Sequence, residues 1–165
     1  MSRIHSVSGN EGGVFVDKVC FEDYTVGELF VSPGRTITET DIVLFSAFTG
    51  DWHPVHTDAE YAAKTPFGER IAHGLLTLCV GTSLLFRLGQ YVVVPKKFIA
   101  FYGMESVRFT APVKIGDTIH CEMKIKSLTE KDTRIGIVEA ETVIKNQRDQ
   151  EVIVYITKIL VGRKS

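Results

Sequence analysis

The sequence has almost no net charge, few cysteines and no long uncharged apolar run, and each lack excludes a class of protein. Among its 165 residues, 19 Lys and Arg oppose 20 Asp and Glu. Proteins that bind nucleic acid usually present a basic face and have a high pI, and electrostatic membrane anchors need clustered cations. We therefore expect neither nucleic acid nor a membrane among the partners. Disorder is excluded as well, because 44% of the residues are hydrophobic.

The three cysteines, Cys20, Cys79 and Cys121, are too widely spaced for a disulfide framework or a CxxC metal pair. Each lies among apolar residues, so we expect small core side chains in a reducing, cytoplasmic compartment. Residues 1–13 are polar and rich in Gly and Ser, with no apolar segment among them. They predict a flexible arm rather than a targeting segment, followed by a single domain over residues 14–165.

Residues 71–89 form the longest apolar-rich run, but they include His73, Arg87 and three glycines. A membrane span needs about 20 predominantly apolar residues with few or no charges. The run therefore predicts a buried helix from residue 71 or 72 to residue 88. Its apolar side chains cover more than one stripe, so we expect the protein core to surround it on most sides.

The second half of the chain has the period of two that is typical of half-buried strands. Apolar residues alternate with polar ones over residues 118–126. The polar stretches 127–133 and 146–151 fit hairpin loops. Three further segments rich in Val, Ile and Thr predict strands, over residues 99–110, 134–145 and 152–161.

The first half mixes short strands with helices. Residues 14–37 predict a strand or two, since their apolar residues are β-branched or aromatic and are interrupted by Gly and Pro. Thr38 and Asp41 have the spacing of a helix capping pair, and Gly50 is a plausible stop for that helix. A second, short helix is expected over residues 59–64. A curved antiparallel sheet wrapped around one apolar helix satisfies all these patterns, so the fold class is α+β.

The densest group of ionisable side chains comprises Asp51, His53, His56, Asp58 and, later in the chain, His73. Pro54 predicts a loop for the segment that carries the first three of them. A carboxylate and an imidazole five residues apart can converge there on one small molecule, and His titrates near neutrality. Such a pair could activate a water and deliver a proton, which adding water across a double bond requires. Two interpretations compete: Asp51 and His56 only stabilise the loop, or these two and His53 bind a metal. Because they lack the helical i, i+4 spacing of HExxH, we expect no metal.

His73 and Gly74 open the predicted long helix, where the first amides have no partner within the helix. Gly74 has no side chain to block a ligand, so its N–H could donate to a developing oxyanion. Alternatively, Gly74 only lets the helix pack closely against the sheet, and His73 only caps or packs. The sequence contains no phosphate-binding glycine fingerprint and no GxSxG nucleophile elbow.

Four segments resemble the MaoC-like dehydratases, a family that includes the (R)-specific enoyl-CoA hydratases. Residues 48–58, FTGDWHPVHTD, resemble the hydratase motif, and residues 71–76, IAHGLL, resemble the start of the central helix. Residues 108–113, RFTAPV, and 116–118, GDT, resemble the strand and turn that follow. The likeness spans roughly residues 20–162. It implies the hotdog fold, in which an antiparallel sheet wraps around a long helix.

The resemblance also implies the site residues. Asp51 and His56 match the catalytic pair that holds the water attacking the β-carbon of a trans-2-enoyl thioester, and one of them returns a proton to the α-carbon. Gly74 matches the glycine whose amide binds the thioester oxygen. Thr82 falls where relatives often place a small hydroxyl near the site. His53 departs from the family, which usually has Asn, so the hydrogen bonding of the pocket and the substrate can differ.

The implied activity is that of a hydro-lyase that converts a trans-2-enoyl-CoA to a 3-hydroxyacyl-CoA, of (R) configuration in the family. The resemblance implies no cofactor, since the CoA thioester is itself the substrate. It implies a homodimer or a dimer of dimers. Two alternatives stay open: an acyl-CoA thioesterase on the same fold, and a non-catalytic acyl-CoA-binding module.

Overall fold

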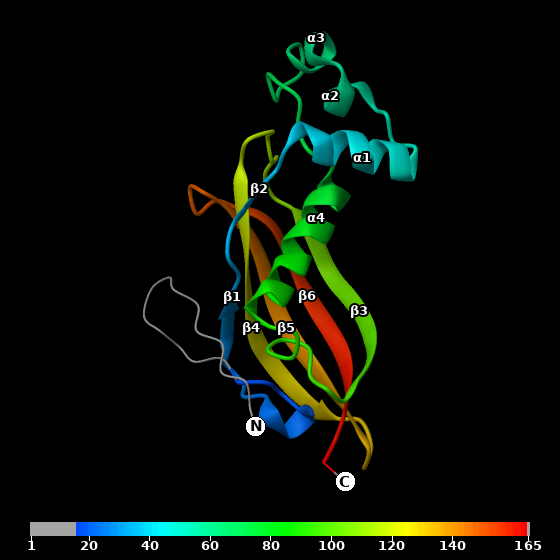
Figure 1. Cartoon of the computed structure of the whole chain (residues 1–165), viewed down its shortest axis with the longest axis vertical. Coiled ribbons are helices and arrows are strands. Elements are labelled where there is room, and N and C mark those ends of the chain that lie inside the picture. Colours follow the sequence, from blue (N-terminus) through cyan, green and yellow to red (C-terminus); the bar gives the residue numbers. More distant parts are fainter. Residues whose placement is uncertain (1–15, 165) are drawn as a thin grey trace.

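The computed structural model describes residues 16–164 as one curved antiparallel sheet wrapped around a helix (Figure 1). The predicted α+β class and the hotdog arrangement are confirmed. The expected flexible arm, residues 1–13, lies outside the described residues. Within the described part of the chain, no helix is long and apolar enough to cross a membrane.

Six strands form the sheet in the order β1-β4-β5-β6-β3, and β2 pairs with β4 beside β1. The long strands β4, β5 and β6 follow one another through short turns and are all antiparallel. The strand bounds are Leu29–Val31 (β1), Arg35–Thr36 (β2), Phe98–Phe109 (β3), Thr118–Glu130 (β4), Ile135–Asn146 (β5) and Glu151–Gly162 (β6).

The second half of the chain forms the strands that the sequence predicts, with one loop shorter than expected. The hairpin loop predicted at residues 127–133 is wrong at its start, because β4 continues to Glu130. An irregularity in the register between Ile125 and Ser127 interrupts the strict alternation. That interruption conceals the last residues of the strand in the sequence pattern.

Between residues 16 and 164, four helices and two 3₁₀ turns complete the fold. The capping pair predicted for α1 is present, since Thr38 and Asp41 exchange hydrogen bonds between side chain and backbone. Gly50 ends α1 in the left-handed conformation, with φ of 80°. The bounds are Phe21–Asp23 (η1), Glu39–Thr49 (α1), Pro54–Thr57 (α2), Ala59–Ala62 (α3), Gly74–Ser83 (α4) and Leu84–Leu88 (η2).

The central helix α4 begins later than the predicted residue 71 or 72. Ile71 forms a β-bridge with Lys114, and the amide of Ala72 donates to the carbonyl of Val113 over 2.7 Å. This extended pairing holds both residues out of the helix. At its other end, α4 tightens into the 3₁₀ turn η2 instead of continuing as α-helix to Leu88.

One face of α4 is open, which the prediction allows, since it places the core around this helix on most sides and not on all. Leu75 is 59% exposed and Phe86, in η2, is 54% exposed, and Cys79 is exposed between them. The predicted core position is therefore wrong for Cys79, whereas Cys20 and Cys121 are buried as expected. The other side packs in the hydrophobic core, through Leu76 and Leu78 of α4 and Leu84 and Leu85 of η2.

Candidate functional site

The segment between α1 and α3 carries the predicted catalytic pair. Pro54 begins the one-turn helix α2 here, where the sequence predicts only a loop. Proline is favoured at the first helical position, because its missing N–H would have no partner there in any case. His53 is the N-cap, and its Nδ1 accepts a hydrogen bond from the amide of Val55 at 3.2 Å. The short helix thereby fixes where His56 projects.

Asp51 lies directly after the glycine that ends α1, and it is exposed. One carboxylate oxygen, Oδ1, accepts a hydrogen bond from the amide of His53 at 3.2 Å. The amide of Asp51 itself donates to Oγ1 of Thr49, also at 3.2 Å. The first contact restricts the orientation of the Asp51 carboxylate, and the second restricts its backbone.

His56 is half-buried, and its Nδ1 lies 2.8 Å from the carbonyl oxygen of Ile71. Because a carbonyl only accepts, Nδ1 carries the hydrogen and Nε2 carries the lone pair. Burial lowers the pKa of His56 below its ordinary 6.5, against the opposing effect of the Ile71 carbonyl. The ring is therefore neutral at neutral pH, with a base available at Nε2.

His73 joins this pair from the N-cap position of α4. Its ring stacks on the ring of His56, with centroids 3.8 Å apart and an interplanar angle of 30°. One side-chain oxygen of Asp51 and one ring nitrogen from each of the two histidines lie within 4.8 Å of one another. From the sequence, capping or packing is the favoured role of His73, because the 22 positions that separate it from Asp51 give no sign of this contact.

The three residues that the sequence offers as metal ligands, Asp51, His53 and His56, are not the group that the structure brings together. His53 uses Nδ1 for the turn of α2, and the cluster consists of Asp51, His56 and His73 instead. Metal coordination needs lone pairs that converge on one point. The rings of His56 and His73 meet face to face, with an interplanar angle of 30°. The group as it stands has side chains that can transfer protons, and the proposal below uses it in that way.

His56 and Gly74 line one cleft of about 500 Å³. Gly74 is the first residue of α4, where a helix amide has no partner within the helix. A Cβ at this position would lie 2.8 Å from Cε1 of Phe109, so a glycine is also needed for packing. Both interpretations of Gly74 are compatible with the structure. Apolar side chains form most of the remaining wall, among them Phe67, Ile71, Val113 and Ile153.

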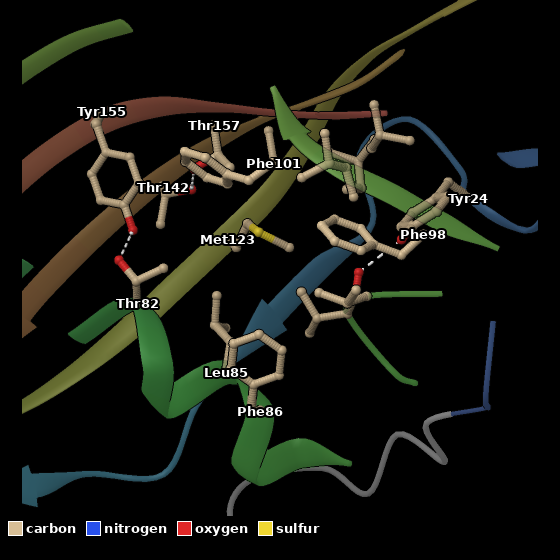
Figure 2. Close-up of a pocket in the computed structure, with 16 residues that line it drawn as sticks. Tyr24, Thr82, Leu85, Phe86, Phe98, Phe101, Met123, Thr142, Tyr155 and Thr157 are labelled. Atoms are coloured by element: carbon tan, nitrogen blue, oxygen red, sulfur yellow. Dashed lines mark hydrogen bonds between the residues drawn. The ribbon is translucent and has the colours of Figure 1, made fainter. Parts of the chain in front are cut away.

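Thr82 does not line this cleft. It lies in α4 about two turns beyond Gly74, in a separate apolar pocket of about 220 Å³ between α4, η2 and the sheet (Figure 2). Thr82 Oγ1 donates to the carbonyl of Leu78 at 2.8 Å and accepts from the hydroxyl of Tyr155 at 2.6 Å. The other hydroxyls of the pocket are paired too, those of Tyr24, Thr142 and Thr157.

Most of the chain matches one known protein family. Residues 23–147 match the family described as MaoC like domain. Protein MaoC from Klebsiella aerogenes is 38% identical over 76% of this chain, but the match spans only 36% of that longer protein. The 3-hydroxybutyryl-CoA dehydratase from Methylorubrum extorquens is 36% identical, over 69% of this chain and 68% of its own length.

Solved structures show the same arrangement. The monoamine oxidase regulatory protein from Archaeoglobus fulgius superposes with a TM-score of 0.83 and 35% identity, covering 90% of this chain and 97% of that one. The R-hydratase PhaJ1 from Pseudomonas aeruginosa superposes with a TM-score of 0.72 and 30% identity, covering 90% and 88%. Relatives with both enzymatic and regulatory names therefore share this fold.

Proposed function

Because the chain belongs to the MaoC-like dehydratase family, we propose that it adds water reversibly to a trans-2-enoyl-CoA to give a 3-hydroxyacyl-CoA. The observation that carries the proposal is the meeting of Asp51 with His56, which lines the same cleft as Gly74. Relatives named as a dehydratase and an R-hydratase support it, and the latter favours the (R) product.

The geometry suggests how the pair divides the work. His56 presents an unprotonated Nε2, so we assign it to take a proton from the attacking water. Asp51 orients that water through its carboxylate. The hydroxyl bonds to the β-carbon, and the pair returns one proton to the α-carbon, which balances the addition. Since one water accounts for every atom that is added and the two side chains only relay a proton, the proposed reaction needs no cofactor.

Gly74 is assigned to the oxygen of the thioester. As electrons move from the double bond toward the carbonyl, negative charge develops on that oxygen. An N–H at the start of a helix is already oriented and adds the helix dipole to its own charge. Removing one such donor in other enzymes costs about 2.7–4 kcal/mol of transition-state stabilisation.

The apolar pocket of Figure 2 is assigned to the distal end of the acyl chain. All of its hydroxyls that are named above are hydrogen-bonded within the protein, including that of Thr82. A pocket without free polar groups favours an alkyl group over a hydroxylated or charged one. Because the pocket lies two helical turns from Gly74, only long chains would reach it.

We further propose that the working unit is a homodimer joined along β3. This strand is 12 residues long and forms an edge of the sheet, so its outer backbone groups are available for pairing. Ile99 and Tyr102 on it are about half exposed, as are Leu75 and Phe86 on the neighbouring helical face. A second copy would cover these side chains. The free cysteines fit a reducing, cytoplasmic compartment.

Substitution of the pair tests the activity. We expect Asp51→Asn and His56→Ala each to lower kcat/KM for crotonyl-CoA by at least about 100-fold, because each removes a group that acts on the water. Loss of the enoyl absorbance measures the reaction. The control is His120→Ala, because His120 lies on β4 outside the cleft.

Hydration, thiol release and binding, measured side by side, separate the alternatives. Near-wild-type hydration by either variant would contradict the assignment of the pair. Release of free CoA thiol without loss of the enoyl group would indicate a thioesterase. Tight binding of enoyl-CoA without turnover by the wild-type protein would indicate a binding module.

A further inference from the structure

We propose that His73 is a positioning residue that holds Asp51 and His56 in register with each other; this rests on the proposed function. One buried side chain contacts both members of the pair. It stacks on the ring of His56 and its Nε2 lies 3.1 Å from the backbone carbonyl of Asp51. His73 thereby links both members of the pair to the start of α4.

The hydrogen bonds determine how His73 is oriented. The carbonyl of Asp51 can only accept, so Nε2 of His73 carries the hydrogen. Oγ of Ser46, a fully buried residue of α1, lies 3.3 Å from the same nitrogen. The centroid of the Phe45 ring lies 4.9 Å from that of His73. Two residues of α1 and the catalytic segment thus fix the plane of one imidazole.

Burial of His73 has a cost that simple packing would avoid. The side chain is only 3% exposed, and Nδ1 has no hydrogen-bond partner among the described residues. A phenyl ring would fill the same space without leaving a polar atom unsatisfied. The hydrogen bond from Nε2 to Asp51 and the stacking of the ring on His56 therefore explain why a histidine is kept here despite this cost.

His73 also connects the base to the oxyanion donor. It is the N-cap of α4, directly before Gly74. A shift of the His73 backbone would move the Gly74 amide, whereas a shift of its ring would move His56. The distance between the base and the helix N-terminus is consequently set through one residue. Small displacements of this kind are sufficient to lower rates strongly, since about 1 Å can cost 100-fold.

Two substitutions separate the contacts. His73→Gln keeps an N–H donor for Asp51 but removes the ring, and His73→Phe keeps a ring but removes the donor. We expect each to lower kcat by about 10- to 100-fold. KM should change by less than about 3-fold, because we assign His73 no contact with substrate. The matched control His120→Gln should retain wild-type kcat, since His120 lies on β4 outside the cleft.

A double-mutant cycle tests whether His73 acts through His56. In a His56→Ala background, His73→Gln should have little further effect on kcat, because the ring on which it acts is gone. A full additional loss in that background would overturn the proposal. So would wild-type kcat in well-folded His73→Gln and His73→Phe proteins, judged by unchanged melting temperatures.

An NMR titration of the ligand-free protein tests the contact without any reaction. The charged and titratable groups around His56 are Asp51, His53 and His73. Removing His73 in His73→Gln should raise the titration midpoint of His56, since a neighbouring imidazole and burial both oppose its protonation. An unchanged midpoint would overturn the proposal even if no enoyl-CoA were hydrated.

The wild-type protein provides a last measurement, which is independent of whether the variants fold. The Nε2–H proton of His73 should give a slowly exchanging NMR signal, because it is buried and hydrogen-bonded. A His73 ring protonated at Nδ1 alone would overturn the proposal. Failure of the wild-type protein to hydrate any enoyl-CoA would instead contradict the proposed function and leave this structural contact measurable.

Discussion

The protonation of His56 links the local structure to the chemistry at the residue scale. Its Nδ1 is committed to the carbonyl of Ile71, which leaves Nε2 as the only ring nitrogen that can take a proton. Desolvation by burial is the largest influence on its pKa and lowers it; the Ile71 carbonyl raises it, and His73 lowers it further. The net direction is downward from 6.5, so the base form persists into weakly acidic solution.

The pH profile of kcat/KM should show this directly. Protonation removes the base, so activity should fall as pH drops through the pKa of His56, with a midpoint below 6.5. Initial rates with crotonyl-CoA in buffers of constant ionic strength measure the limb. Circular dichroism at each pH separates titration from unfolding. A midpoint at or above 6.5 would contradict the lowered pKa.

At the scale of elements, the position of α4 on the sheet depends on a close approach at Gly81. A Cβ there would overlap Cδ1 and Cγ1 of Ile144, which is fully buried in β5. Two effects of Gly81→Ala oppose each other. Alanine favours the helix by about 1 kcal/mol, whereas overpacking a tight core costs about 1–3 kcal/mol. Because Ile144 has no room to withdraw, we expect the overpacking to dominate.

Gly81→Ala should therefore lower the free energy of unfolding by up to about 2 kcal/mol, measured by urea titration. Ile144→Val removes the nearest methyl, so the double variant should be more stable than the sum of the single effects predicts. Gly103→Ala is the matched control, since a Cβ at Gly103 would meet nothing within 4 Å. Wild-type stability of Gly81→Ala would show that the helix can move away from the sheet.

At the scale of the whole molecule, the sheet has two unequal edges. One edge is formed by β1 and β2, which are three and two residues long, whereas the other is formed by β3, which is 12 residues long (Figure 1). Long, exposed apolar edge strands normally pair or are blocked by charges. The proposed dimer covers the long edge and leaves the short one in solvent.

Charges on β3 should dissociate that dimer. We expect Ile99→Lys combined with Tyr102→Lys to yield a monomer of 18.4 kDa, because like charges would face each other across the joined edges. Light scattering coupled to size exclusion measures the mass. Leu29→Lys on β1 is the control, since Leu29 is also half exposed at a sheet edge. A wild-type monomer, or a dimer lost only in Leu29→Lys, would contradict the proposal.

Much of this protein was determined by local sequence. The capping pair Thr38 and Asp41 starts α1 and Gly50 ends it, because both signals act within one turn. The alternation of apolar and polar residues predicted the long strands, because this pattern too depends only on neighbouring residues. Asp51 and His56 could be paired in advance, since five residues of chain and one proline limit their separation. The resemblance in the segments around them indicated the family.

Only the tertiary structure decided which distant groups meet. His73 contacts Asp51, which lies 22 positions earlier in the chain. Thr82 lies in a pocket apart from the cleft, although the sequence predicts one helix that contains both His73 and Thr82. The same holds for Cys79, whose apolar neighbours predict burial but which faces outward from α4. Sequence periodicity describes how one element is amphipathic. It contains no information on which surface covers each face, because that depends on how separate elements pack.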